Sequence, residues 1–222
     1  MRVLVIQNTV YGPVGLFGAW LAAQGARLDV IAPEDIPDAP GNEDLVVTLG
    51  SPHGAYEDVP WIAPQRDFLR ASAEADRPVI GICFGAQLLA NAIGGTAAPM
   101  PDGQVHVGWH ENAEVAAPVW AGPWVRWHGD HLQVPASAEV LARDKGTVQA
   151  FQYRRSVGVQ FHPEAGLEQI CLWASKMPAW IAGAGLSEAR LEAQSREHLP
   201  RLQAARDALF AEMLRRTVGE RT

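Results

Sequence analysis

The chain has 222 residues, of which 48% are hydrophobic and 19% are charged. This length suits one sizeable domain, and the apolar content excludes a disordered chain because enough surface can be buried to offset the ordering entropy. The formal net charge of −7, without any cluster of lysine and arginine, argues against a nucleic-acid partner.

Two cysteines, Cys83 and Cys171, are too few for a disulfide framework. The apolar run at residues 3–6 is too short for a signal peptide, and no stretch has the length of a membrane span. We therefore expect a cytoplasmic protein without a membrane partner. The glycine-rich segments match neither a phosphate-binding loop nor a dinucleotide fingerprint, and we expect no cofactor.

Strands and helices alternate along the first hundred residues. Runs of β-branched residues and leucine predict buried strands, and apolar residues at helical spacing predict helices. The expected strands are residues 3–6, 27–31, 45–49 and 78–82, and the expected helices are about 13–25, 61–75 and 87–94. This alternation predicts a mainly parallel sheet with helices on both faces.

The middle of the chain, residues 96–162, carries short β-type runs such as 124–127 and 156–161. We interpret them as further strands, some antiparallel, that join the same sheet or cover its edge. From about residue 165 helical spacing returns, with a break expected at Pro200. The fold class predicted is a three-layer α/β/α domain with a flavodoxin-like, mainly parallel sheet and added antiparallel strands.

We divide the chain into a main domain at residues 1–185 and a helical extension at residues 186–222. The extension carries apolar residues at broadly helical spacing, so it must cover them. We expect it to pack either on the same domain or on a partner.

Cys83 lies between two glycines, in the sequence Gly-Ile-Cys-Phe-Gly at residues 81–85, where a buried strand meets a helix. Such a junction holds a nucleophile in a strained conformation that larger residues at 81 and 85 would obstruct. The following helix points free N–H groups at the sulfur, which favours the thiolate. Most free cysteines are small buried hydrophobes. We assign that role to Cys171, which has no flanking glycine, and a nucleophilic role to Cys83.

A nucleophilic cysteine requires a base, and the base requires a group that orients it. His162 and Glu164 flank Pro163 directly after the strand expected at 156–161. If Glu164 continues that strand, both side chains face the same side and the carboxylate can meet the imidazole. A lone histidine is more often structural, but this pair beside a glycine-flanked cysteine favours a catalytic triad.

These motifs resemble the class I (triad) glutamine amidotransferases, over roughly residues 1–180. Gly-Ile-Cys-Phe-Gly-Ala-Gln at 81–87 is similar to the family's nucleophile motif, and Gly-Val-Gln-Phe-His-Pro-Glu at 158–164 to its His/Glu motif. Gly-Ser-Pro at 50–52 resembles its oxyanion strand, and Trp-His-Gly-Asp at 127–130 its substrate loop. The likeness is greatest to the stand-alone, GMP-synthase-like group.

The resemblance implies that Cys83 attacks the side-chain amide of glutamine or of a γ-glutamyl compound, with His162 shuttling protons and Glu164 orienting His162. A γ-glutamyl thioester forms, ammonia or an amine leaves, and water releases glutamate. The backbone N–H groups of Ser51 and Phe84 are implied to form the oxyanion hole.

The resemblance also implies a set of substrate-binding residues: Gly50, Gln87, Trp127, His128 and Gly129. Two residues depart from the family's usual pattern, Ser51 in place of a glycine and Phe84 in place of a leucine. A Cβ at Ser51 restricts a peptide flip that some members use, whereas Phe84 keeps its N–H available. We expect neither change to abolish activity.

His128 and His131, with Asp130 between them, have the spacing of a partial zinc site. No third ligand cluster is evident, so we assign the segment to the substrate loop and expect no metal. The remaining histidines in the first half of the chain are expected at the surface or in a supporting layer behind the site: His53, His106 and His110.

Four of the eight tryptophans lie close together, at positions 109, 120, 124 and 127. We assign most of them to the core of the added strands. The alternative is an apolar wall beside the scissile bond that receives an aromatic or alkyl leaving group, with Trp127 as the best candidate.

The leading function is hydrolysis of a γ-glutamyl amide bond, in two versions. Either glutamine is the substrate and ammonia passes to a separately encoded synthetase, or the protein acts alone on a larger γ-glutamyl amine or peptide. The alternative is a catalytically silent binding or regulatory module of the same fold. The third and least favoured hypothesis is a chaperone-like or protease-like member of the superfamily. The motifs and the helical tail account for nearly all 222 residues, so we expect no attached synthetase domain.

Overall fold

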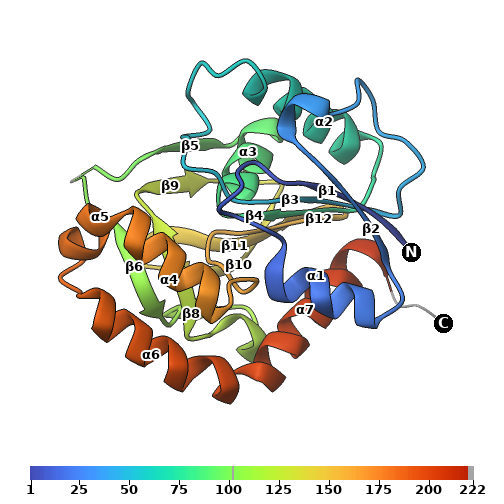
Figure 1. Cartoon of the computed structure of the whole chain (residues 1–222). Helices are drawn as coiled ribbons and strands as arrows, with labels where there is room; N and C mark the ends of the chain where they lie inside the picture. The colour runs from blue at the N-terminus through green and yellow to red at the C-terminus, as the bar shows by residue number, and fades with distance from the viewer. Residues whose placement is uncertain (102, 220–222) are drawn as a thin grey trace.

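The computed structural model describes residues 1–101 and 103–219 (Figure 1). An eight-stranded sheet runs through its centre in the order β2-β1-β3-β4-β12-β11-β10-β7. Its strands are β1 (Arg2–Ile6), β2 (Arg27–Ile31), β3 (Leu45–Thr48), β4 (Val79–Ile82), β7 (Glu114–Val115), β10 (Glu139–Asp144), β11 (Thr147–Tyr153) and β12 (Ser156–Val159). The strands from β2 to β12 are parallel, and the three pairings beyond β12 are antiparallel.

The helices cover both faces of this sheet, with α1 and α7 on one face and α2 and α3 on the other (Figure 1). Their bounds are α1 (Gly15–Ala23), α2 (Ile62–Glu74), α3 (Phe84–Ala92), α4 (Leu167–Lys176), α5 (Pro178–Gly183), α6 (Glu188–Arg201) and α7 (Gln203–Val218), with short 3-10 turns at Pro33–Asp35 and Pro118–Trp120. The predicted three-layer α/β/α class with a mainly parallel sheet is confirmed.

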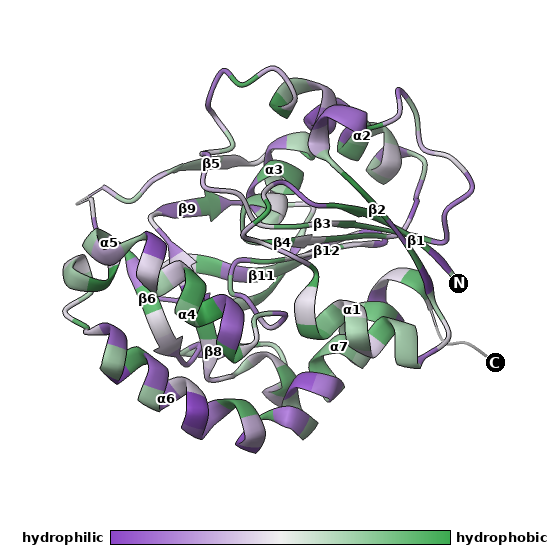
Figure 2. Ribbon diagram, in the orientation of Figure 1, coloured by the Kyte–Doolittle hydropathy of each residue, from purple (hydrophilic) through white to green (hydrophobic). Residues whose placement is uncertain are grey.

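The core follows from the alternation of side chains along β1. Val3 and Val5 point to the face covered by α1 and α7, whereas Leu4 and Ile6 point to the face covered by α2 and α3. Both sets are apolar because both faces are buried, and much of the central strands is green in Figure 2.

Two short antiparallel ribbons lie outside the main sheet. They pair β5 (Thr96–Pro99) with β9 (Asp130–Gln133), and β6 (His106–His110) with β8 (Trp124–His128). The strand predicted at 124–127 therefore exists but does not join the main sheet. Together with α4, α5 and α6, the β6–β8 ribbon buries an apolar cluster of its own, and this packing replaces pairing to the sheet edge.

The C-terminal helices pack onto the rest of the chain. Phe210 of α7 lies against Phe17 and Trp20 of α1, with ring centroids 4.8 and 5.8 Å apart. The predicted break is displaced: α6 continues through Pro200 and ends at Arg201, because proline removes only its own N–H and the next turn still closes. The division of the chain at residue 185 stays a prediction.

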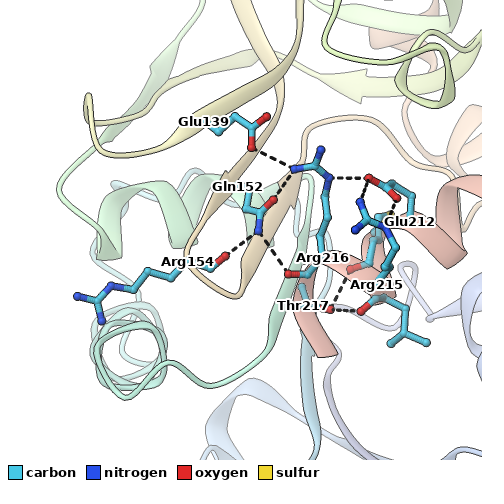
Figure 3. Close-up of polar contacts among 9 residues, drawn as sticks. Glu139, Gln152, Arg154, Glu212, Arg215, Arg216 and Thr217 are labelled. Carbon is cyan, nitrogen blue, oxygen red and sulfur yellow. Dashed lines mark hydrogen bonds and ion pairs between the residues drawn. The ribbon is translucent and has the colours of Figure 1, made fainter. Parts of the chain in front are cut away.

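Polar contacts fix the last turn of α7 against the antiparallel strands (Figure 3). Arg216 bonds to Glu139 of β10 at 3.1 Å, to Gln152 of β11, and to Glu212 of its own helix at 2.7 Å. Gln152 in turn donates to the backbone carbonyl of Arg216 at 3.3 Å. These contacts hold α7 in one position over the sheet.

Within residues 1–101 and 103–219, no helix combines the length and the apolar character that crossing a membrane requires.

Candidate active site

Three neighbouring parallel strands direct the predicted site residues to one edge of the sheet. β3, β4 and β12 lie side by side, with Gly158 of β12 opposite Gly81 of β4. The segments that follow these strands carry Ser51, Cys83 and His162 respectively. Because the carboxyl ends of parallel strands meet at the same edge, residues far apart in the sequence converge there.

Cys83 is the single residue between β4 and α3, and its backbone is strained, with φ 53° and ψ −110°. Such a conformation costs an L-residue on the order of 1–3 kcal/mol and occurs mainly at functional sites. A Cβ on Gly85 would lie 2.2 Å from the carbonyl oxygen of Thr48, and one on Gly81 would lie 2.6 Å from that of Gly85. The close approach of the backbone therefore requires both glycines.

His162 and Glu164 meet, although not as neighbours on a strand. Their Nδ1 and Oε1 atoms are 2.7 Å apart and both side chains are buried. The expectation that Glu164 continues the strand was wrong, since β12 ends at Val159 and residues 160–164 form a turn. The N–H of His162 bonds to the carbonyl of Val125 on β8 at 2.7 Å, which turns the chain away from the main sheet.

The electrostatics of this pair favour a protonated imidazole. Burial by itself lowers the pKa of His162, but the carboxylate of Glu164 and the sulfur of Cys83 outweigh it and raise that pKa to about 10. An imidazolium at neutral pH stabilises a thiolate beside it. The buried carboxylate of Glu164 and the sulfur of Cys83 therefore lie on either side of an imidazole that favours its protonated form.

Two further groups surround the sulfur of Cys83. The Nε2 of Gln160 donates to Sγ at 3.6 Å, and the carbonyl oxygen of Trp127 lies 3.8 Å from it. Gln87 is buried and donates from its Nε2 to the Oε1 of Gln160 at 3.2 Å. Gln160 belongs to the quoted His/Glu motif, but its contact with the sulfur depends on the pairing of β4 with β12 and was not predicted.

The predicted oxyanion donors lie at the ends of β3 and β4. Phe84 is the first residue of α3, so its N–H has no acceptor within the helix. The N–H of Gly85 bonds to the carbonyl of Leu49 at 3.1 Å and ties this helix start to the segment of Ser51. A Cβ on Gly50 would lie 3.2 Å from the imidazole of His162, so this segment runs directly beside the base.

A cavity of about 630 Å³ opens above Cys83. Most of the predicted site residues line it: Gly50, Ser51, Cys83, Gln87, Trp127, His128, Gly129, His162 and Glu164. Phe84 is buried and is not among the residues that line the cavity. Asp130 of the predicted substrate loop also lines it. Further lining residues were not predicted as part of the site: Tyr11, Tyr56, Glu57, Trp173, Lys176, Met177 and Trp180.

Comparison with known protein families identifies the family of this chain. The family model described as glutamine amidotransferase class-I matches residues 21–170, more than half of the chain. The chain belongs to the class-I glutamine amidotransferase family.

Relatives and solved structures agree with this family. The glutamine-hydrolysing GMP synthase of Mycobacterium marinum is 31% identical over 96% of this chain and 46% of its own length. The glutamine amidotransferase-like protein YfeJ of Salmonella typhimurium is 27% identical over 77% of this chain and 78% of its own. A glutamine amidotransferase from Methylobacillus flagellatus shares the fold with a TM-score of 0.86 at 23% identity, covering 100% of this chain and 96% of that one.

This chain spans less than half of the length of the GMP synthases that it matches. The comparisons show membership of the class-I family. The activity of this chain, the residues that perform it, the substrate and any partner are matters of proposal.

Behind the substrate loop of this class-I family member lies a cluster of buried histidines. His128 donates from Nδ1 to the carbonyl of Asp130 at 2.8 Å, and its ring lies edge-on to that of His106 with centroids 5.1 Å apart. Burial, followed by the proximity of His106, lowers the pKa of His128 well below its usual range. Burial and the charge of Arg126 lower the pKa of His106 to about 4. Of the two positions expected for His106, at the surface or in a supporting layer, the structure has the second, because His106 is buried beside the loop.

This cluster predicts a loss of stability in acid. Its folded-state pKa values lie below the unfolded value of about 6.5, so the unfolded chain binds more protons as the pH falls. The free energy of unfolding in urea is expected to decrease between about pH 6.5 and pH 4. His106→Gln should flatten this decrease and His198→Gln on α6 should not. An equal slope in wild type and His106→Gln would contradict the assignment.

No group of three or more metal-ligating side chains gathers within the described part of the chain. Trp120, Trp124 and Trp127 are buried, as expected of core positions, and Trp127 also lines the cavity. Cys171 is not core. It is partly exposed on α4, because the buried face of this helix carries Ile170 and Trp173 instead.

Proposed function

We propose that this family member hydrolyses the γ-amide bond of glutamine or of a γ-glutamyl amine through a γ-glutamyl thioester on Cys83. The observation that carries the proposal is the juxtaposition of Cys83, His162 and Glu164 at the base of one cavity. A strained nucleophile, a base and a buried orienting carboxylate are the groups that acyl transfer requires.

In the first half of the reaction, the thiolate of Cys83 attacks the γ-carbonyl carbon. The N–H groups of Phe84 and Ser51 bind the oxyanion that develops. The imidazolium of His162 gives its proton to the leaving nitrogen, and the C–N bond breaks. In the second half, His162 takes a proton from water, which attacks the thioester and releases glutamate.

The part of the cavity lining around Asp130 suits the charged end of a glutamyl group. Asp130 is half-buried and accepts from the hydroxyl of Tyr56 at 3.3 Å, and Glu57 lines the same part of the cavity. Burial raises the pKa of the Asp130 carboxyl, and a bound ammonium would favour its ionised form. We therefore assign the α-ammonium to Asp130, with Gly129 and its neighbours in the loop holding the carboxylate.

The nitrogen released has two destinations. The GMP synthase relatives favour a separately encoded synthetase as the partner that receives ammonia. Release of a larger amine requires no partner. The triad chemistry is the same in both versions.

Mass spectrometry tests the covalent step. We expect acid quenching of the protein during turnover to trap a γ-glutamyl adduct on the peptide that contains Cys83. Cys171 is an internal control, because it is partly exposed and lies outside the cavity. An adduct on Cys171 alone, or none during measurable turnover, would exclude the thioester.

Glu164→Gln is expected to move the alkaline limb of the pH–rate profile to lower pH. The carboxylate of Glu164 and the sulfur of Cys83 together outweigh burial and raise the pKa of His162 to about 10, and the proton on His162 is lost as the pH rises through that value. Removing the negative charge lowers the pKa, so the protonated acid disappears earlier. The exposed Glu168→Gln is the matched control and should keep the wild-type limb. Coincident profiles for both variants would refute the role of Glu164.

A further inference from the structure

The cavity above Cys83 is larger than free glutamine requires. Its volume of about 630 Å³ lies in the range of about 300–1,000 Å³ typical of pockets that enclose drug-sized ligands. A glutamyl group placed between Cys83 and Asp130 fills only part of it. The remaining lining includes residues of α4 and the segment of Tyr11.

One face of α4 forms a wall of this cavity. Trp173, Lys176 and Met177 are three and four residues apart, so they share one side of the helix, and all three line the cavity. The indole of Trp173 is held in place by its N–H, which donates to the carbonyl of Tyr11 at 2.7 Å. Its ring also lies 5.6 Å from that of Trp127, and together they make a fixed aromatic surface.

This wall adjoins the place where the leaving group departs. The ring of Trp173 packs edge-on against the imidazole of His162, with centroids 4.7 Å apart. His162 protonates the leaving nitrogen in the proposed reaction, so a substituent on that nitrogen meets Trp173. Lys176, the last residue of α4, and Met177, its C-cap, follow three and four residues after Trp173.

The lining of the cavity carries charged groups of both signs. The carboxylates of Asp130 and Glu57 belong to it, and Asp130 is the residue assigned to the α-ammonium of the glutamyl group. Among the lining residues that the structure describes, Lys176 is the one lysine or arginine, and its side chain is exposed at the end of α4. An anionic group on the leaving amine would find its counter-charge there.

We propose that the preferred substrate is a γ-glutamyl derivative of an apolar α-amino acid, an inference that rests on the proposed function. The apolar side chain packs on Trp173 and Met177, and the carboxylate pairs with Lys176. Cys83 forms its bond to the γ-carbonyl carbon as the C–N bond breaks, and the amino acid leaves with the proton from His162. Water then cleaves the thioester, so no further reactant is needed.

Glutamate release by the purified full chain from three compounds tests the proposal. They are glutamine, γ-glutamyl-phenylalanine and γ-glutamyl-phenethylamine, which lacks only the carboxylate. We expect kcat/KM for γ-glutamyl-phenylalanine to exceed that for glutamine at least about tenfold, from burial of the ring. It should exceed that for γ-glutamyl-phenethylamine about threefold to fivefold at low salt, and less at high salt.

The two lysines of the chain provide a matched pair of variants. Lys176→Met should remove the advantage of γ-glutamyl-phenylalanine over γ-glutamyl-phenethylamine, whereas Lys145→Met in the distant turn between β10 and β11 should retain it. If turnover depends on Cys83 but kcat/KM for glutamine equals or exceeds that for γ-glutamyl-phenylalanine, the substrate assignment is overturned and the proposed function still stands. The same holds if Lys176→Met keeps the advantage. No Cys83-dependent release from any of the three compounds overturns both.

Discussion

Cys83→Ala is expected to lower kcat/KM for glutamate release by at least about 10⁴-fold, the scale of effect seen when a covalent nucleophile is removed. The sulfur is the one group placed to form the thioester, at the base of the cavity and beside the His162 imidazolium. The loss should appear in kcat, since the variant keeps the cavity and the loop that hold the substrate. Steady-state kinetics with glutamine and with a γ-glutamyl amide measure it.

Cys171→Ala is the control for this experiment, because it removes the other thiol of the chain from outside the cavity. It should retain wild-type kinetics. Circular dichroism and thermal unfolding should show that Cys83→Ala keeps the fold, since the substitution removes one buried atom and fits the same space. If wild type and Cys83→Ala release glutamate at the same rate, the chain is better described as a binding or regulatory module of this fold.

Asp144→Ala is expected to lower the free energy of unfolding by about 3–5 kcal/mol, because it leaves a buried guanidinium without its counter-charge. The Nη1 of Arg126 lies 2.5 Å from the Oδ2 of Asp144, with side chains only 1% and 11% exposed. This contact joins β8 to the end of β10, and Arg126 also donates to the Oδ1 of Asn112 at 2.8 Å. Urea unfolding followed by circular dichroism measures the loss.

The matched control is Glu197→Ala on α6, where Arg201 and Glu197 are also 2.5 Å apart but are 72% and 54% exposed. An exposed pair contributes less than about 1 kcal/mol, so this variant should unfold close to wild type. The Arg126→Met and Asp144→Leu double variant should recover part of the stability by removing both charges together. Equal losses for Asp144→Ala and Glu197→Ala would show that burial does not govern the strength of this pair.

The alternation of strands and helices in the first hundred residues predicts most of the sheet, because each buried strand carries its own continuous apolar run. The pairing of the strands after residue 96 is harder to predict from the sequence. The run at 124–127 has the composition of a sheet strand, yet β8 pairs with β6 in a separate ribbon. Apolar residues indicate that a strand is buried but not which neighbour buries it, and the apolar cluster formed with α4, α5 and α6 decides this.

The triad motifs are local and therefore readable, since the glycines around Cys83 and the proline between His162 and Glu164 carry their own backbone requirements. Glu164 nevertheless lies elsewhere than predicted, because it does not continue the strand. Its carboxylate reaches His162 through a turn, and the bond from His162 to Val125 on β8 diverts the chain at that point. The direction of the chain after β12 therefore depends on β8, a strand that lies more than 30 residues earlier in the sequence.

The sequence by itself determined the fold class, the family resemblance and the three residues to which the proposed chemistry is assigned. The physical reason is that strand periodicity and a glycine-flanked turn depend on residues close together in the chain. Only the tertiary structure decided that α4 presents Trp173 and Lys176 to the cavity, and that His106 and Arg126 are buried behind the loop. Those neighbours come from elements far apart in sequence, so their positions depend on how the helices and ribbons pack, and no local pattern of residue types records that packing.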